Sequence, residues 1–335
     1  MNSLERLNKR LRGEPVDRAP NLDIFMRFAA HYIGQSLSSY YLDYRILAEA
    51  NLALLEPFKI DIVQAVSDPY RETADFGAEV LFPDDDFPLM IQPLLQEPGD
   101  LLKIQPPNPY NGRRMSDRLM AVRYLREQVG GETPIMGWVE GALEQAANLR
   151  GVTALLVDLY DRPEWLTELL EMAVQVEIEF ARLQVAMGAD IIGLGDAIAS
   201  QISPAMYRQF ALPYEQRIIA AVHEMGALAR LHICGNISLI LPDLLASGAD
   251  IIDVNWMVDF AQAARVFGDR AAPCGNMDAV RIFLQGSSDE VRRDVRRALE
   301  QGGARCLNAA ECEIPDGTPA ENLLAQAAVL QGALE

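Results

Sequence analysis

The sequence predicts an α/β chain folded as a (β/α)₈ TIM barrel, and three observations support that fold class. Helical patterns separate most of a series of apolar runs, which is the order expected for a parallel sheet covered by helices. Polar residues collect at the carboxyl ends of the runs, where such barrels place their active sites. The runs number eight, which favours a barrel over a doubly wound open sheet. The eight runs occupy residues 19–25, 59–68, 133–140, 188–196, 228–234, 248–255, 271–276 and 303–311.

The first two runs are followed by an unusual segment. The run APNLDIF carries Asp23, and KIDIVQAVSD ends at Asp68. After this second run, residues 83–114 contain PDDDFP and PPNPYNGRR. A long proline-rich segment inside a compact domain is usually functional. We therefore predict an insertion after the second strand, forming a hairpin or lid over the barrel mouth, within a single domain of residues 1–335.

Two helices of the central region have recognisable ends. The pattern over 161–188 predicts a helix with Asp161 as its N-cap. The pattern over 203–226 predicts a second helix, with Ser203 as its N-cap and a kink at Pro213. Helices of this length between apolar runs are typical of βαβ units.

Charge and hydropathy exclude several classes of partner. The formal net charge of −19 would repel phosphate backbones and anionic membrane surfaces, so we expect no nucleic-acid partner. The N-terminal segment lacks the apolar stretch of a secretory signal, and no apolar run approaches the roughly 20 residues that cross a bilayer. Four cysteines in 335 residues do not make a disulfide framework. These features predict a cytoplasmic protein without a membrane partner.

The fifth run carries the clearest chemical signal. Because side chains alternate along a strand, Arg230, His232 and Cys234 share one face, and the opposite face is entirely apolar. The apolar face suits packing against helices, so the polar face should point into the barrel. Burying such groups without partners costs roughly 1–3 kcal/mol each. A metal ion bound by His232 and Cys234 would explain them, and zinc suits nitrogen with sulfur.

A third ligand must come from another part of the chain. The candidates are Cys274 in the seventh run, Cys306 in the eighth, and Cys312 just after the eighth. We favour Cys312, because a loop after a strand can fold over the mouth, and place Cys274 second. A buried core thiol is the alternative interpretation. A redox role is disfavoured because no C-x-x-C motif is present.

Further polar residues at strand ends are expected to face the same mouth. The strand ends offer Asp68, Glu140, Asp196, Asn255 and Asn276. The alternative is that strand ends carry polar residues simply because they approach the surface.

Two adjacent charged residues lie just after the second run. We expect Arg71 and Glu72 to form an ion pair on the surface or in a loop. No catalytic function is predicted for either residue.

Several of these stretches carry a family resemblance. LHICGN, GADIIDVNWMV, PCGNMDAV and ECEIPDGTPAENLLA resemble the uroporphyrinogen decarboxylase superfamily, and more narrowly its corrinoid-dependent methyltransferases, such as the methylcobamide:coenzyme M methyltransferases. Further matching stretches lie at 67–80, 138–151 and 195–218. The resemblance covers nearly the whole chain and implies a (β/α)₈ barrel, in agreement with the strand count.

The resemblance also implies a metal centre and a reaction. In the thiol-methylating branch the zinc ligands follow the pattern H-x-C…C, and the matching positions are His232, Cys234 and Cys312. A methyl group would pass from methylcobalamin to a small-molecule acceptor, either a zinc-activated thiol or tetrahydrofolate. The chain has no D-x-H-x-x-G motif, so the methylcobalamin would arrive on a separate corrinoid protein.

The remaining site residues follow from the same resemblance and from their positions. The expected catalytic residues are Asp68, Asp196 and Asn255, which would also suit a pterin acceptor. The expected substrate contacts are Arg27, Tyr70, Glu140, Arg230 and Asn276. Asn255 stands about where the thiol-methylating relatives have an acidic residue, which is a departure from the pattern.

The chain departs from the true decarboxylases at their substrate-binding motif. The family motif M-R-Q-A-G-R-Y corresponds to MRFAAHY here, so Arg27 is kept while the second arginine is His31. The histidine that the decarboxylases use near the C-terminus is absent, since the last histidine is His232. A substrate with eight carboxylates needs several cations, so these departures favour methyl transfer. An ion pair of Arg27 with Asp23 or Asp68 is its alternative role.

Two other functions remain open from the sequence. One is uroporphyrinogen decarboxylase activity in porphyrin biosynthesis, and the other is a non-catalytic corrinoid or pterin binding protein.

Overall fold

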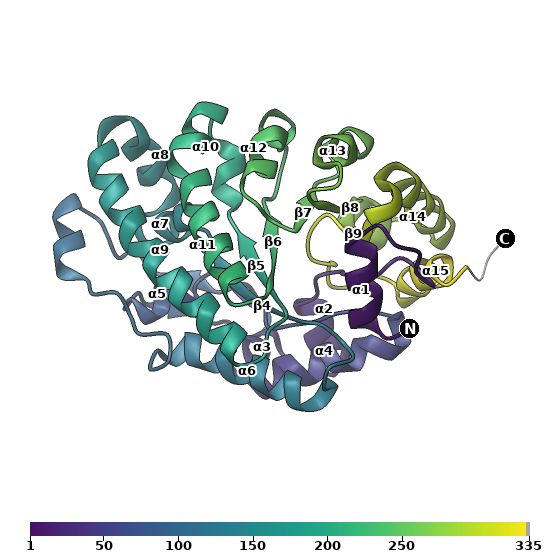
Figure 1. The fold of residues 1–335 in the computed structure, drawn as a ribbon. Helices are drawn as coiled ribbons and strands as arrows, with labels where there is room; N and C mark the ends of the chain where they lie inside the picture. The colour runs from purple at the N-terminus through teal and green to yellow at the C-terminus, as the bar shows by residue number, and fades with distance from the viewer. Residues whose placement is uncertain (333–335) are drawn as a thin grey trace.

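A computed structural model describes residues 1–332, and its central feature is a sheet of seven parallel strands. The strand order is β1-β4-β5-β6-β7-β8-β9, so each strand pairs with the strand of this sheet that follows it in the chain. Helices surround the sheet, and the first and last helices, α1 (Ser3–Leu11) and α15 (Ala320–Leu330), lie on the same side of the molecule (Figure 1). The strands are β1 (Val63–Gln64), β4 (Ile135–Glu140), β5 (Ile191–Gly195), β6 (Leu228–His232), β7 (Ile251–Val254), β8 (Ala272–Met277) and β9 (Leu307–Ala310).

The first predicted run closes the sheet into a barrel. Asn21 forms a parallel bridge with Asn308 of β9, and the Leu22 amide donates to the Asn308 carbonyl at 2.8 Å. On the other side, the Asp61 amide just before β1 donates to the Asn21 carbonyl at 2.9 Å. Residues 19–25 therefore occupy the eighth position between β9 and β1. The predicted barrel is confirmed, although this run forms isolated bridges in place of a regular strand.

The helices that follow the strands form the outer layer of the barrel. The α-helices are α1 (Ser3–Leu11), α2 (Arg27–Tyr32), α3 (Leu37–Leu42), α4 (Tyr44–Phe58), α5 (Arg71–Asp75), α6 (Arg113–Val129), α7 (Ala142–Arg150), α8 (Val152–Asp161), α9 (Pro163–Ala186), α10 (Pro204–Phe210), α11 (Leu212–Glu224), α12 (Leu241–Ala246), α13 (Phe260–Phe267), α14 (Ser288–Gly302) and α15 (Ala320–Leu330). Shorter helical turns are η1 (Pro98–Lys103), η2 (Ala197–Gln201), η3 (Ser238–Ile240), η4 (Ala279–Leu284) and η5 (Gly303–Arg305).

Of the two N-caps predicted from the sequence, the structure confirms Ser203 and contradicts Asp161. The Ser203 side chain accepts a hydrogen bond from the Met206 amide, so the predicted N-cap is confirmed. The expected kink is a break at Ala211, with Pro213 in the first turn of α11. Asp161 is the last residue of α8, so the prediction that it caps the next helix is wrong. Proline at the first position, Pro163, starts α9 because its fixed φ already suits a helix.

The insertion after the second run lies beside the N-terminal helices. A short antiparallel hairpin of β2 (Val80–Leu81) and β3 (Leu89–Met90) begins before residue 83. Its tip is fixed to α3, because the Ser38 amide donates to the Asp84 carbonyl and the Leu37 amide donates to Asp85. A lid function for residues 83–114 stays a prediction.

The barrel is filled by apolar side chains and covered by helices. The strands β4, β5, β7, β8 and β9 are buried along their whole length, as expected when one face meets helices and the other meets the barrel interior. Among residues 1–332, no helix combines the length and apolar character needed to cross a membrane. The polar side chains inside the barrel gather near the carboxyl ends of the strands, where the site lies.

Candidate metal centre and adjoining cavity

Three soft ligands meet at the carboxyl end of the barrel. His232 ends β6, Cys234 follows two residues later, and Cys312 lies in the loop after β9. The His232 Nε2 atom is 3.1 Å from Cys234 Sγ and 3.9 Å from Cys312 Sγ, and the two sulfur atoms are 3.9 Å apart. The structure thus brings together an imidazole and two thiols from segments that are 80 residues apart.

The other two cysteines lie away from this group. Cys274 is fully buried, with its Sγ atom 3.7 Å from Arg230 Nη2. Cys306 is also fully buried, at the amino end of β9, and donates to the Ala298 carbonyl. Neither thiol is positioned to join the group at the mouth.

The local backbone explains how two side chains of β6 reach the same point. Strand β6 is held on both sides, by pairing with β5 and with β7. The sheet ends at His232, and Gly235 adopts a φ of +91° shortly afterwards. A residue with a side chain is strained at that angle, so glycine lets the chain turn directly after Cys234. The turn holds the Cys234 thiol beside the imidazole.

The Asp253 carboxylate holds the imidazole of His232 in position, and the Arg230 guanidinium holds that carboxylate in turn. The His232 Nδ1 atom is 2.7 Å from Asp253 Oδ2, which leaves Nε2 facing the thiols. The Asp253 carboxylate accepts from Arg230 Nε at 2.9 and 3.0 Å, and Arg230 also donates to the Leu22 carbonyl. A carboxylate behind a ligating histidine fixes the ring orientation and the tautomer. The sequence prediction missed Asp253, although it shares a strand face with Asn255.

The electrostatics of the group couple a raised pKa of the imidazole to a lowered pKa of one thiol. Burial lowers the pKa of His232, but the charge of Cys234 and the hydrogen bond to Asp253 outweigh burial and raise it overall. The hydrogen bond from Cys234 lowers the pKa of Cys312 well below that of a free thiol, in spite of burial. The same hydrogen bond and burial raise the pKa of Cys234. The group therefore carries negative charge on sulfur at its centre.

The donor set fits a zinc ion. One imidazole nitrogen and two sulfur atoms, all within 4.8 Å of one another, are ligands of the type that zinc prefers. The side chains that would hold zinc are His232, Cys234 and Cys312. Three protein ligands leave a fourth position for a substrate, which is typical of catalytic zinc sites.

A cavity of about 280 Å³ opens directly beside the three ligands. Its apolar part comes from Ile24, Met26, Val66 and Trp138, and the Trp138 ring lies 5.8 Å from the His232 ring between centroids. Its polar part is acidic. The carboxyl groups that line it belong to Glu140, Glu144, Asp196 and Glu313.

Burial raises the pKa of each carboxyl group that lines the cavity. It raises the pKa of Glu140 to about 8 against the opposing charge of Arg71, and that of Glu313 to about 7. The pKa of Glu144 also rises by burial. For Asp196, burial and then the charge of Glu215 raise the pKa well above its ordinary value. No lysine or arginine is among the described residues that line the cavity.

Behind the cavity lies a second layer of buried charge. Arg71 is fully buried, with Nη2 2.6 Å from Glu140 and 3.3 Å from Glu72. The expected ion pair between Arg71 and Glu72 is formed, but its expected position on the surface or in a loop is wrong, because both residues belong to α5, which packs against α7. Glu177 of α9 is fully buried, and neither of its carboxyl oxygens has a hydrogen-bond partner among the described residues.

Four of the predicted residues lie near the mouth without lining the cavity. Asp68 forms a buried ion pair with Arg114, and its Oδ1 accepts from the Tyr70 amide at 3.0 Å. Asn255 donates to Glu311 in the loop that carries Cys312. The fourth residue, Arg27, is 3.6 Å from Asp316, so the alternative role as an ion pair is formed with Asp316 in place of Asp23 or Asp68.

Two others are held elsewhere by their partners. Arg230 is fully buried, where it supports Asp253, and it is not among the described residues that line the cavity. Asn276 donates to the Val258 carbonyl and accepts from Arg297 of α14, so its side chain faces the outer helix. The structure thus brings Glu140 and Asp196 to the cavity, and the catalytic or substrate roles of all these residues stay predictions.

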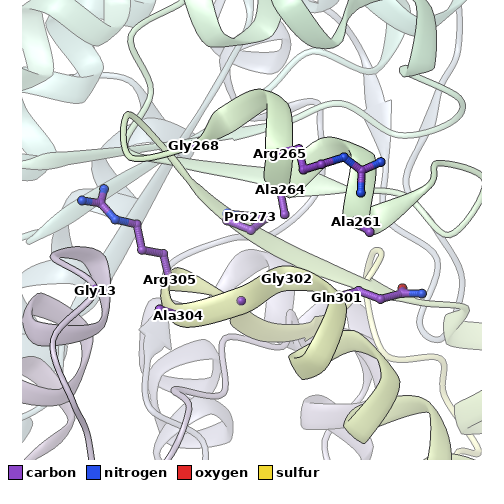
Figure 2. A pocket seen from close by; sticks show the side chains of 11 residues that line it. Gly13, Ala261, Ala264, Arg265, Gly268, Pro273, Gln301, Gly302, Ala304 and Arg305 are labelled. Atoms are coloured by element: carbon purple, nitrogen blue, oxygen red, sulfur yellow. The ribbon is translucent and has the colours of Figure 1, made fainter.

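A second hollow lies at the opposite end of the barrel. It measures about 370 Å³ and lies near the amino ends of β8 and β9, between α13 and α14 (Figure 2). Small residues line most of it, and Arg265 and Arg305 contribute the charged side chains. No thiol, imidazole or carboxylate is among the described residues that line it. The chemistry is therefore concentrated at the mouth.

Comparisons with known proteins agree with this geometry. The family described as Uroporphyrinogen decarboxylase (URO-D) matches residues 2–331. Methylcobamide:CoM methyltransferase MtbA of Methanosarcina acetivorans is 30% identical over 326 residues, covering 95% of this chain and 94% of that protein. MtaA of Methanosarcina barkeri is 32% identical over 231 residues, which cover 68% of this chain and only 64% of that protein. Uroporphyrinogen decarboxylase of Xanthomonas euvesicatoria is 27% identical, with 90% of each chain covered.

Solved structures show the same fold. A methyltransferase from Methanosarcina mazei superposes with a TM-score of 0.87 at 26% identity and covers 99% of both chains. A B12-independent methionine synthase from Shewanella superposes with a TM-score of 0.60 at 16% identity, which shows a shared fold alone.

Proposed function

The chain belongs to the uroporphyrinogen decarboxylase family, and from that premise we propose that it is a corrinoid-dependent methyltransferase. It would move a methyl group from a methylated corrinoid, carried on a separate corrinoid protein, to the sulfur of a small thiol. The observation that carries the proposal is the convergence of His232, Cys234 and Cys312 beside a cavity. The relatives named methylcobamide:CoM methyltransferases support it.

The chain's own residues prepare the site for this chemistry. Zinc, when bound, would supply a Lewis acid that lowers the pKa of a thiol at its open position. Asp253 holds the His232 ring so that Nε2 faces the two sulfur atoms. Trp138 and the apolar residues of the cavity exclude water from the sulfur of the acceptor. A thiolate kept from water is a stronger nucleophile toward the methyl group.

The size of the cavity supports separate binding positions for the acceptor and for the corrinoid protein. Pockets for drug-sized ligands measure about 300–1,000 Å³, so a cavity of about 280 Å³ suits a small thiol. A corrinoid macrocycle is much larger and would remain outside, with its methyl group presented at the mouth. The acceptor therefore occupies the cavity while the donor docks over it.

The charge of the cavity speaks against the decarboxylase alternative. Its substrate carries eight carboxylates, and the lining here holds carboxyl groups without a lysine or arginine among the described residues. The carboxylates of such a substrate would lose their hydration and gain no cationic partner from the lining. Tetrahydrofolate is the second candidate acceptor, because Glu140 and Asp196 at the cavity can accept hydrogen bonds from ring N–H groups.

A demethylation assay tests the proposal. Purified protein would be loaded with zinc and mixed with methylcobalamin and either a panel of thiols or tetrahydrofolate, while absorbance follows loss of the methyl group. We expect thiol-dependent demethylation that disappears in Cys234→Ser. Equal rates of demethylation by the wild type and by Cys234→Ser, measured with tetrahydrofolate and no thiol, would favour tetrahydrofolate as the acceptor. Tight corrinoid binding without transfer to any acceptor would indicate a binding protein, and coproporphyrinogen formation without metal would indicate a decarboxylase.

A further inference from the structure

The two thiols among the candidate metal ligands lie close to each other. Cys234 Sγ and Cys312 Sγ are 3.9 Å apart, although 78 residues separate them in the chain. A C-x-x-C motif brings two thiols together within one short segment, whereas here the fold does so between the loop after β6 and the loop after β9. The S–S bond of a disulfide is about 2.05 Å long. The two sulfur atoms therefore need to approach each other by less than about 2 Å to be joined.

The backbone around Cys234 can shift without losing hydrogen bonds. Cys234 and Gly235 follow the last paired residue of β6, and neither forms a backbone–backbone hydrogen bond with another described residue. Cys312 lies on a more firmly held segment, because the amide of the preceding residue, Glu311, donates to the Met277 carbonyl at 2.8 Å. A small movement of residues 234–235 toward Cys312 therefore closes the distance between the sulfur atoms.

A small oxidant can reach both sulfur atoms. Cys234 and Cys312 are partly exposed, and both line the cavity of about 280 Å³ beside the metal ligands. Cys274 and Cys306 are fully buried. Susceptibility of a cysteine to oxidation follows its exposure as well as its thiolate character. Peroxide therefore meets the pair at the mouth before it meets the two buried thiols.

We propose that Cys234 and Cys312 form an oxidative modification site, at which hydrogen peroxide joins them in a reversible disulfide and the bound metal is released. One thiolate sulfur attacks the peroxide, the O–O bond breaks, and a sulfenic acid and one water result. The second sulfur attacks the sulfenic sulfur, the S–O bond breaks, and the other oxygen leaves as water. The two sulfur atoms lose two electrons in total, and the two water molecules take up two protons from the thiols or, where metal holds thiolates, from solvent.

The disulfide removes two of the three side chains that would hold zinc. Metals bind the thiolate form of cysteine, and a disulfide offers no thiolate. His232 alone remains, held by Asp253, and one imidazole is a weak site for zinc. A reducing thiol breaks the S–S bond and restores both ligands. The modification depends on the distance and exposure of two sulfur atoms, so it holds whichever molecule accepts the methyl group.

Peptide mapping and zinc release test the proposal together. Full-length zinc-loaded protein is treated with hydrogen peroxide, alkylated and digested with trypsin without reduction, while a chromophoric chelator records free zinc. Trypsin places Cys234 in peptide 231–265 but both Cys306 and Cys312 in peptide 306–335. Cys306→Ala is therefore the parent protein, in which a link between these two peptides assigns Cys312. We expect this cross-link, release of zinc in proportion to it, and recovery of both thiols and of zinc binding after dithiothreitol.

Single-cysteine variants show whether the pair is required. They are compared as metal-free proteins, so that weakened zinc binding in a variant does not affect the result. In the parent protein carrying Cys312→Ser, peroxide should oxidise Cys234 to the sulfinic acid, which dithiothreitol does not reverse. Cys234→Ser should expose Cys312 to the same fate. The cross-link between peptides should be absent from both variants.

Three results would overturn the proposal. The first is zinc release without the cross-link, and the second is a cross-link to Cys274 or between two chains. The third is survival of free thiols at Cys234 and Cys312 while peroxide consumes a small thiol in the same solution. If the cross-link forms and the reduced, zinc-loaded protein methylates no acceptor, the proposed function fails and the modification site stands.

Discussion

The two walls of the barrel mouth solve the problem of buried charge in different ways. The metal-side wall consists of Arg230, His232, Cys234, Asp253 and Cys312. Its charged groups alternate in sign: Asp253 lies between Arg230 and His232, and the His232 Nε2 atom is 3.9 Å from Cys312 Sγ. The acid-side wall lies on the other side of the mouth and consists of Arg71, Glu72, Glu140, Glu177 and Asp196.

On the acid-side wall the carboxyl groups outnumber the cations. One guanidinium faces Glu72 and Glu140, and the carboxyl group of Glu177 has no hydrogen-bond partner among the described residues. Burial raises the pKa of Glu140 and of Glu177 as a result. The comparison teaches that one wall pairs its charges around three candidate metal ligands, whereas the other holds carboxyl groups whose pKa is raised by burial.

The largest effect should come from removing a ligand of the metal-side wall. Cys312→Ser replaces a thiolate with a hydroxyl, which is a poor zinc ligand. We expect the zinc content of the purified protein to fall close to zero and thiol-dependent demethylation to be lost. Metal analysis by mass spectrometry measures the first effect. Cys306→Ala, at the other end of the barrel, should keep its zinc, and full zinc occupancy in Cys312→Ser would exclude Cys312 as a ligand.

The next largest effect should come from the only guanidinium that faces Glu72 and Glu140 among the described residues. Arg71→Met leaves these buried carboxyl groups without a cation, and breaking a buried pair costs about 3–5 kcal/mol. The loss should be larger at about pH 8 than at about pH 5, because protonated carboxyl groups need no counter-charge. Urea unfolding at both pH values measures it. Arg217→Met, at an exposed pair, should cost less than about 1 kcal/mol. An equal loss at both pH values would contradict the charge explanation.

A smaller effect is expected from the carboxylate behind the imidazole. Asp253→Asn keeps the shape of the side chain but weakens its hold on His232, and loss of such a partner lowers metal affinity by about 10–100-fold. Competition with a chromophoric chelator measures zinc affinity directly. Asp250→Asn is the matched control, since Asp250 lies just before the same strand and contacts His223 and the Ala229 amide. Unchanged zinc affinity in Asp253→Asn would show that Arg230 and the backbone suffice to orient the ring.

The smallest effect, when compared per pH unit, concerns the buried carboxyl group of Glu177 in the acid-side wall. Burial raises the pKa of Glu177, so the folded protein keeps a proton that the unfolded chain releases above the ordinary glutamate value. Stability from this group is present at low pH and is lost as pH rises. Glu177→Gln has no such loss, so its stability relative to the wild type should increase with pH, by at most about 1.4 kcal/mol per pH unit. Chemical unfolding between about pH 5 and pH 9 measures the trend. Parallel stability curves would show that Glu177 is ionised in the folded state.

The sequence by itself determined the barrel fold and the three candidate metal ligands. Strand alternation placed His232 and Cys234 on one inward face, and the position after the last strand made Cys312 the favoured third ligand. These inferences depend on spacing within one strand or on the order of elements along the chain. Both can be read directly from a sequence. The closing position of residues 19–25 was also readable, although its irregular bridges were not.

Only the tertiary structure decided which polar residues meet. The same alternation that marks Asn255 also marks Asp253, and strand register alone places the latter behind His232. Arg71 and Glu72 look like a surface pair in sequence, yet the packing of α5 against α7 buries them beside Glu140. Arg230 and Asn276 are drawn to partners on other elements. A periodic pattern reports the face of one element, whereas the charge of a cavity depends on contacts between residues that are distant in the chain.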